Sequence, residues 1–531
     1  MACSKIFSGD LPELIYEVVK YFQNDFSTLH SCVLVNRLWC RLAIPILWEN
    51  PFSIPTENYN FIEVYLCNLS DDLKTKLNEY KINLNLLSSN TLFNYPSFIK
   101  YLNTREFVYS IKKWTEGAIT TGNICFLQGV DLWPAEKLIY MSLFKIIIEN
   151  EISLQTLEIG HSSYNSYLDD ILGLMLQNPN FIKNIKNLNL HTHYLLYYNS
   201  NKYASFINRV SQIINSHQNL KKIILCYKSF PLYKPLLLSK DSNCSNSLNT
   251  LMLYRVNFKN IIDIDKVFEQ LNVLESVHIV YCHSFDTHFI QQIINLTKPF
   301  KLKSLFVTKI SQIKPFQSLL QKSGNYIVNF GIKFFGLSLE QQLIELIIEY
   351  CKNIKFLDIY EYENQVIHLV LNLIENIKQS LNHLSIYAGE ISSHENDTFI
   401  ERSSTILRNL GQILPLKLEY LSLTLNICVN DFEIFLTNSQ NTFINKLLIN
   451  NIEGQDILPY MKEYIMKKKR VKYLAIMNCF ESTMSDDDEI YNNKELILLE
   501  NEVKEFKLYN IKVQRYYDLS IGRSKLIKEL V

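Results

Sequence analysis

The sequence has no apolar run that approaches the roughly 20 residues of a membrane-spanning helix. Its first residues, MACSKIFSGDLPEL, carry charges at Lys5 and Asp10 and contain no apolar signal core. Basic and acidic side chains balance at 53 each, so no excess charge would attract nucleic acid or an anionic membrane. We therefore expect an intracellular, cytoplasmic protein without nucleic-acid or membrane partners, or a nuclear one if the basic run at 467–470 is a nuclear signal.

Motifs that carry chemistry are also missing. The 11 cysteines include no C-x-x-C pair, which argues against a disulfide framework or a zinc knuckle. The segment GAITTG at 117–122 lacks the residues that complete a phosphate-binding loop, and no G-x-S-x-G or H-E-x-x-H pattern occurs. Two groups could ligate a metal, Cys282 with His283 and His288, and His191 with His193, but neither has a second ligand pair at zinc spacing. We expect no metal, no cofactor and no catalytic residue, and thus a protein that is not an enzyme.

Apolar residues crowd the first 50 positions, which hold two of the four tryptophans, Trp39 and Trp48. Pro12 and Glu13 suit the start of a helix, Asp25 or Ser27 suits the N-cap of a second, and Pro45 should kink or end a third. Three short helices that are apolar on more than one face cannot bury all this surface by themselves. The surplus should pack on the remainder of the chain or on a partner.

These residues resemble an F-box in order, spacing and type: Leu-Pro-Glu-Leu-Ile at 11–15, Leu-Val-Asn-Arg-Leu-Trp at 34–39 and Pro-Ile-Leu-Trp at 45–48. The resemblance covers about a tenth of the chain. It implies docking to the Skp-type linker subunit of an SCF ubiquitin ligase, and through the linker to a cullin. It also implies that Trp48 lies at the junction with the following domain. Carried over by position, the docking residues are Leu11, Pro12, Ile15, Val19, Leu29, Cys32, Val35 and Trp39.

A second pattern recurs from residue 154 onwards: apolar, two residues, apolar, one residue, apolar. Successive starts lie 25 to 37 residues apart, close in most cases to the 20–29 residues of a leucine-rich repeat. Helix-like stretches lie between them, so we expect parallel strands on a concave face with helices outside. The repeats are degenerate, because the usual Asn or Cys after the strand occurs only at Cys282, Asn426 and Cys479. The predicted strands are LQTLEI (154–159), IKNLNL (185–190), LKKIIL (220–225), LNTLML (248–253), LESVHI (274–279), LKSLFV (302–307), IVNFGI (327–332), IKFLDI (354–359), LNHLSI (381–386), LEYLSL (418–423), INKLLI (444–449), VKYLAI (471–476) and VKEFKL (503–508).

Residues between the apolar positions of each strand should point out of the concave face. Tyrosines recur at aligned positions there, and tyrosine is enriched among the residues that anchor protein interfaces. The candidate substrate face comprises Tyr254, Tyr360, Tyr387, Tyr509, His278 and Asp358.

The sequence thus predicts an α/β protein with an F-box at 7–50, a partly helical connection at 51–100, a leucine-rich-repeat solenoid at 101–515, and a C-terminal cap or tail at 516–531. We expect a substrate-recognition adaptor for ubiquitin-dependent degradation, in which the repeats bind a target protein. The alternative is a leucine-rich-repeat scaffold outside the ubiquitin system whose F-box-like start does not dock.

Overall fold

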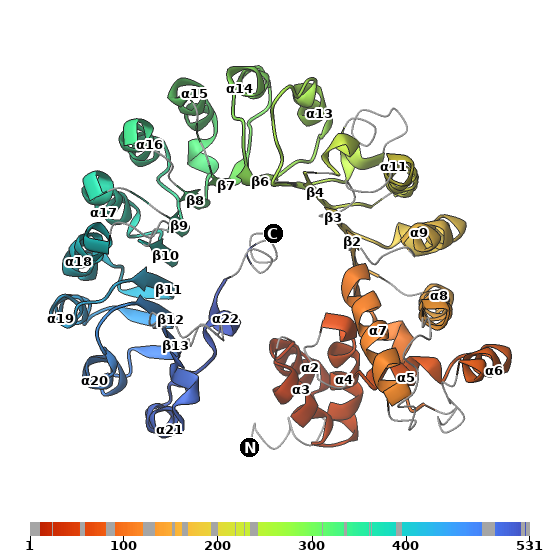
Figure 1. Ribbon diagram of the computed structural model, residues 1–531. Coiled ribbons are helices and arrows are strands. Elements are labelled where there is room, and N and C mark those ends of the chain that lie inside the picture. Colours follow the sequence, from red (N-terminus) through yellow and green to blue (C-terminus); the bar gives the residue numbers. More distant parts are fainter. Residues whose placement is uncertain are drawn as a thin grey trace, which may run out of the picture. The chain divides into compact units, whose positions relative to one another are not determined.

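The structure is a computed structural model (Figure 1). It describes residues 11–23, 25–53, 59–80, 91–120, 133–150, 154–161, 168–192, 200–217, 219–227, 229–233, 243–308, 310, 312–333, 337–360, 362, 364–388, 396–479, 494–521 and 526. The chain divides into two compact units, residues 1–251 with 270–273, and residues 252–269 with 274–531. Among the described residues, no helix is both long and apolar enough to cross a bilayer.

The first described elements of the first unit are three helices, α2 (Pro12–Tyr21), α3 (Phe26–Val33) and α4 (Arg37–Leu47). Asp25 is the N-cap of α3, where its carboxylate accepts a hydrogen bond from the Thr28 amide at 3.0 Å. Asn36 caps α4 by accepting from the amides of Leu38 and Trp39 at 2.9 and 3.0 Å. Pro45 does not end the third helix, which continues to Leu47.

Short helices then lead to the first part of the sheet. They are η1 (Pro51–Ser53), α5 (Phe61–Leu66), α6 (Asp71–Glu79) and η2 (Tyr95–Phe98). Strands β1 to β4 pair in chain order and in parallel. The elements of this part are β1 (Tyr101–Asn103), α7 (Thr104–Thr120), α8 (Trp133–Glu149), β2 (Thr156–His161), α9 (Leu168–Gln177), α10 (Pro179–Lys183), β3 (Asn187–Thr192), α11 (Ser200–Asn215), β4 (Lys222–Cys226), η3 (Phe230–Leu232) and η4 (Asn243–Asn246). Strand β5 (Thr250–Tyr254) begins in this unit, and its last three residues belong to the second unit.

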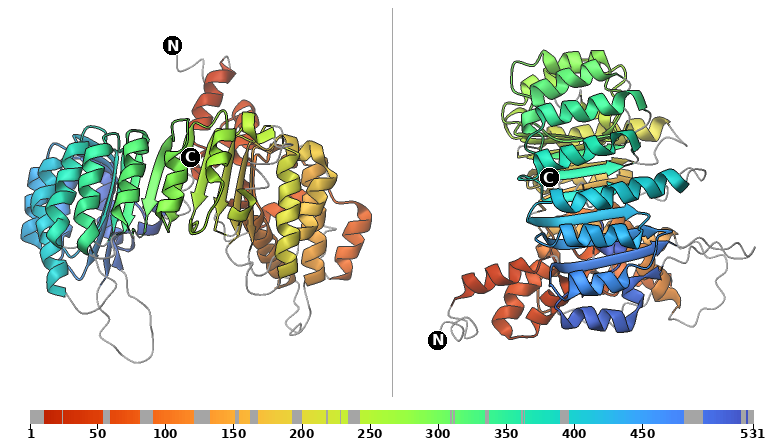
Figure 2. Two further views of the ribbon diagram at one scale, coloured as in Figure 1. Left: turned by 90° about the horizontal axis from the view of Figure 1, so that it is seen from above. Right: turned by 90° about the vertical axis from the view of Figure 1, so that its left-hand side faces the viewer.

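In the second unit, parallel strands again alternate with helices in chain order. The helices α14 to α19 lie side by side on one face of the sheet (Figures 1 and 2). Its elements are α13 (Ile264–Gln270), β6 (Ser276–Cys282), α14 (Thr287–Ile294), β7 (Leu302–Val307), α15 (Ile313–Ser323), η5 (Gly324–Tyr326), β8 (Asn329–Lys333), α16 (Leu337–Tyr350), β9 (Phe356–Tyr360), η6 (Asn364–Val366), α17 (Ile367–Ile377), β10 (His383–Tyr387), α18 (Asn396–Ile413), β11 (Lys417–Leu425), α19 (Val429–Asn438), β12 (Phe443–Ile452), α20 (Leu458–Tyr460), η7 (Met461–Met466) and β13 (Val471–Cys479).

The predicted fold class is confirmed: this is an α/β protein with the strand–helix alternation of a leucine-rich-repeat-like solenoid. Twelve of the thirteen predicted segments overlap strands β2 to β13. The thirteenth, 503–508, is wrong, because it lies within helix α21 (Glu500–Leu508). Val503 and Phe506 are three residues apart, a spacing that places both side chains on one side of a helix. Of the two, only Phe506 is buried.

Strand register explains why the predicted pattern works. One residue of each strand from β7 to β13 pairs with its equivalent on the next strand, so that together they form a row across the sheet. Every residue of this row is a leucine or a phenylalanine that is no more than 1% exposed, and the row forms the core under the helices. Its members are Leu305, Phe330, Leu357, Leu384, Leu421, Leu447 and Leu474. The next residue of each strand belongs to the opposite face, which we call the open face. That row contains Phe306, Gly331, Asp358, Ser385, Ser422, Leu448 and Ala475.

Two short strands close the outer edge of β13. β14 (Lys494–Glu495) pairs with it in antiparallel orientation, and β15 (Lys512–Val513) pairs with it in parallel. Between them lie η8 (Leu496–Leu498) and α21, and the one-turn helix α22 (Tyr516–Leu519) follows. An unpaired edge would offer its amides and carbonyls to other chains, so these strands protect the end of the sheet.

Candidate interaction surfaces

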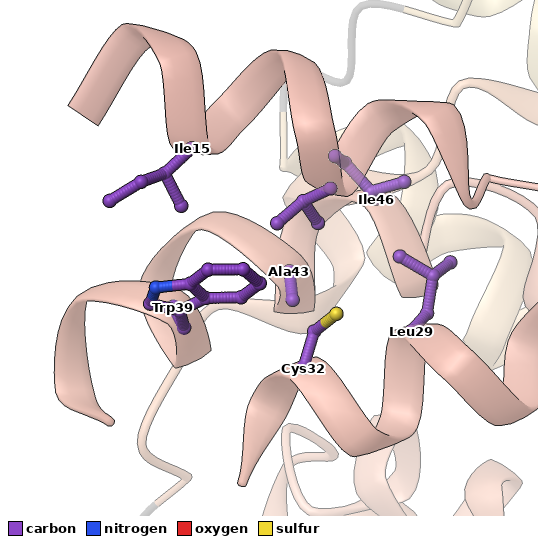
Figure 3. Packing of buried hydrophobic residues seen from close by; sticks show 7 residues of the cluster. Ile15, Leu29, Cys32, Trp39, Ala43 and Ile46 are labelled. Carbon is purple, nitrogen blue, oxygen red and sulfur yellow. The ribbon is translucent and has the colours of Figure 1, made fainter. Parts of the chain in front are cut away.

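Five of the eight predicted docking residues lie inside the three-helix domain. Ile15, Val19, Leu29, Cys32 and Trp39 are each no more than 7% exposed, and they pack against one another with Ala43 and Ile46 (Figure 3). Side chains buried in this way hold the three helices together and cannot contact a partner in this conformation. We therefore reassign these five residues from the docking surface to the core of the domain.

The surface of the domain carries other apolar residues. Leu11, Leu14, Val18 and Tyr21 are exposed and follow one another at spacings of three and four along α2, so they form a second apolar stripe beside the buried one. Leu34 and Val35, in the turn between α3 and α4, are 74% and 49% exposed. Of the predicted docking residues, Leu11 and Val35 are thus exposed and Pro12 is half-buried.

Sequence reasoning missed Leu14, Val18, Tyr21 and Leu34. A signal was available, because the apolar face of α2 is wider than a single core-facing stripe requires. Exposed apolar residues that are regularly spaced on one helix are typical of an interaction surface.

Trp48 lies where the three-helix domain joins the sheet of the first unit. Its ring contacts Tyr65 and Tyr95, with ring centroids 5.6 and 4.4 Å apart. The adjacent Glu49 carbonyl accepts from the amides of Lys100 and Tyr101 at 2.9 and 3.1 Å, and its carboxylate pairs with the Lys100 ammonium. These contacts attach the end of α4 to the start of β1, at the junction where Trp48 was predicted.

Aromatic rings cross the open face of the second unit as a connected belt. Each ring of this belt contacts the next, beginning with Tyr254 and Tyr281 and ending with His383 and Tyr420. The ring centroids of successive members are between 5.6 and 6.3 Å apart. Tyr281 is an extra residue at a β-bulge of β6 and has φ 55, a conformation that few non-glycine residues adopt. The complete belt is Tyr254, Tyr281, Phe306, Phe356, His383 and Tyr420.

The predicted tyrosine stripe is only partly present. Tyr360 and Tyr387 are paired neighbours on β9 and β10, with ring centroids 5.7 Å apart and both rings half-buried. Tyr254 is 5% exposed and belongs to the belt. Tyr509 must be removed from the stripe, because it follows helix α21 and lies on no strand.

The two polar residues predicted for this face are buried. His278 is 4% exposed and its Nδ1 lies 2.7 Å from the Ser304 hydroxyl, which in turn accepts from the Asn329 amide group at 2.9 Å. Asp358 is also 4% exposed, and its buried Oδ1 has no hydrogen-bond partner among the described residues. Burial raises the pKa of the Asp358 carboxyl to about 7.

This shift predicts a pH-dependent stability. The folded chain binds the Asp358 proton more tightly than the unfolded chain, whose carboxyl has a pKa near 3.8, so this group lowers stability as the pH rises from about 4 to 7. Asp358→Asn should therefore be more stable than wild type at pH 8, by up to about 4 kcal/mol, and nearly equal to it at pH 4. Denaturant unfolding of both chains at pH 4 and pH 8 measures the two free energies of unfolding. If that free energy changed with pH by the same amount in wild type and in Asp358→Asn, the prediction would be wrong.

The C-terminal segment covers the open face of β11 to β13. Leu519 is 5% exposed and packs against Tyr420, Leu448 and Ala475. The Ile521 amide donates to the Tyr420 hydroxyl at 3.2 Å. Elsewhere on the open face, Phe306 and Asp358 are also buried, at 0% and 4% exposed, whereas Tyr360 and Tyr387 are half-buried.

The remaining candidates have structural roles or lie outside the described residues. Cys282 is fully buried, its sulfur accepts from the Val256 amide at 3.3 Å, and burial raises the pKa of its thiol to about 12. The described part of the chain contains no group of three His, Cys, Asp or Glu side chains that could hold a metal ion. His193 lies outside the described residues. In the basic run, Arg470 is buried and donates to the carbonyls of Leu436, Ser439 and Thr442.

Comparison with models of known protein families and with curated proteins finds no match for this chain.

Proposed function

We propose that this protein is the substrate-recognition subunit of an SCF-type ubiquitin ligase. The exposed apolar stripe of α2, with Leu34 and Val35, docks the Skp-type linker, and the repeats hold the target protein. The observation that carries the proposal is this stripe, on a three-helix domain whose sequence resembles an F-box. Docking would bury the N-cap Leu11 and three apolar side chains of α2 that water now contacts, which favours association.

The chain contributes no reacting group in this proposal. The ligase would act by proximity, because a target held on the repeats has a raised effective concentration at the ubiquitin-carrying enzyme. The open face offers the paired, half-buried rings of Tyr360 and Tyr387, and tyrosine is enriched among the residues that anchor protein interfaces.

Co-expression with a Skp-type linker tests the proposal. The two chains should co-purify through a size-exclusion step as a one-to-one complex, and the complex should then recruit a cullin. A chain that elutes alone while remaining folded would favour the second candidate, a repeat scaffold with a non-docking start. That candidate keeps the open face as its binding surface and predicts no change of the target's ubiquitination.

A further inference from the structure

The sheet of the second unit is complete before the C-terminal segment begins. β14 covers the outer edge of β13 at Met477 and Asn478, and β15 covers it at Tyr473 and Leu474. The Gln514 amide makes the last backbone bond to β13, at 2.9 Å to the Leu474 carbonyl. Residues 515–521 add no strand, so their contacts with the open face are not needed to close the edge.

A small set of side chains holds this segment. Leu519 is its central anchor on Tyr420, Leu448 and Ala475, and Tyr516 and Ile521 pack at the margin of the same cluster. Backbone bonds of one helical turn run from the Leu519 amide to Arg515 and from the Ser520 amide to Tyr516, and the Tyr516 amide donates to the Glu495 carboxylate of β14 at 3.3 Å. On its outer side, Tyr517 is 68% exposed.

The surface beneath Leu519 differs from the three preceding strands in the same row. At equivalent positions β9, β10 and β11 carry Asp358, Ser385 and Ser422, whereas β12 and β13 carry Leu448 and Ala475. Along this row, the open face is therefore apolar on β12 and β13 and polar on β9 to β11. An apolar patch bordered by polar residues is typical of a surface that binds a partner.

We propose that the open face over β11 to β13 is a docking surface for a short peptide segment, and that residues 515–521 occupy it within the same chain. The ligand it accepts has an aromatic residue, a leucine three positions later and an aliphatic residue two positions after that, as in Tyr516, Leu519 and Ile521. This proposal rests on the proposed function in one respect: the peptide that displaces the chain's own segment is taken to come from a target protein.

The test uses the full-length chain and a fluorescent peptide of residues 514–521, QRYYDLSI. Leu519→Asp should release the tethered segment, because a carboxylate cannot be buried against Leu448 and Ala475 without a partner. Fluorescence anisotropy should then show the peptide binding to this variant about 10-fold more tightly than to wild type, in which the tethered copy competes at a high effective concentration. The variant Tyr517→Asp places the same charge on an exposed neighbour and should behave as wild type.

Hydrogen exchange on the wild-type chain provides a second readout that needs no variant. The amides of Leu519 and Ser520 should exchange about 100-fold faster than that of Leu474, because releasing the segment leaves the sheet intact. Exchange as slow as that of Leu474 would overturn the proposal, as would a folded Leu519→Asp chain that fails to bind the peptide. Neither measurement involves the linker, so a chain that fails to dock the linker would still give a clear answer here.

Discussion

Replacing Leu14 and Val18 together with aspartate is expected to weaken binding to a Skp-type linker by at least about 100-fold, or about 2.7 kcal/mol. Both side chains are exposed, at 51% and 42%, and stand four residues apart on α2. If they enter the interface, each aspartate must lose water without gaining a partner, which costs more than the loss of apolar contact alone. Isothermal titration calorimetry measures the change.

Lys20→Asp is the matched control for this double variant. It alters the net charge by two, as the double variant does, and Lys20 is likewise exposed on α2. It stands two residues beyond Val18, about 200° around the helix, so it lies away from the apolar stripe. An equal loss of affinity in both chains would mean that charge, and not the stripe, governs binding. Unchanged affinity in the double variant would remove the stripe from the docking surface.

A second large effect is expected from a pair of leucines that differ in burial. Leu29 is 0% exposed in the core of the three-helix domain, whereas Leu34, just beyond the same helix, is 74% exposed. Leu29→Ala should destabilise this domain by about 2–5 kcal/mol, because it leaves a cavity in the core. Leu34→Ala should change the domain's stability by less than about 0.5 kcal/mol and yet weaken linker binding.

Hydrogen exchange of the α2 and α3 amides, with calorimetric titration of the linker, separates the two effects. The Leu29→Ala domain, where it remains folded, should retain most of its affinity because its exposed stripe is unchanged. If Leu34→Ala destabilised the domain as much as Leu29→Ala does, the assignment of core and surface would be incorrect.

The sequence predicted the strands well because each of them meets the same requirement. A parallel strand covered by helices needs a core residue at fixed positions, and Leu305, Leu357 and Leu384 occupy paired places in that row. The same apolar spacing does not distinguish a strand from a short helix, which explains the failure at 503–508. β1 was missed because three residues are too few to display a period.

The candidate sites were harder to predict, for two physical reasons. The F-box resemblance identifies which positions are apolar, but α2 has two apolar sides, and only packing shows that Ile15 and Val19 lie inside while Leu14 and Val18 lie outside. On the open face, ring contacts depend on strand register and on the bulge at Tyr281, neither of which the sequence pattern reveals. No signal in the repeats indicated that Leu519 would cover β12 and β13.

The two proposed surfaces suggest an order of events that can be tested. The three-helix domain would be available to the linker at all times, because its apolar stripe is exposed in this conformation. The open face over β11 to β13 would become available only when Leu519 leaves it. A target segment would then have to compete with the chain's own C-terminal segment, which would favour ligands that carry both the aromatic and the leucine anchor.

The most direct test of the account is a calorimetric titration of the purified wild-type chain with a Skp-type linker. If the α2 stripe docks the linker, we expect one-to-one binding with a Kd between nanomolar and low micromolar, about −12 to −8 kcal/mol, and loss of most of that affinity in the Leu14→Asp, Val18→Asp chain. A folded wild-type chain that releases no heat with the linker and shows no complex by size exclusion would contradict it, and the exposed stripe of α2 would then require another partner.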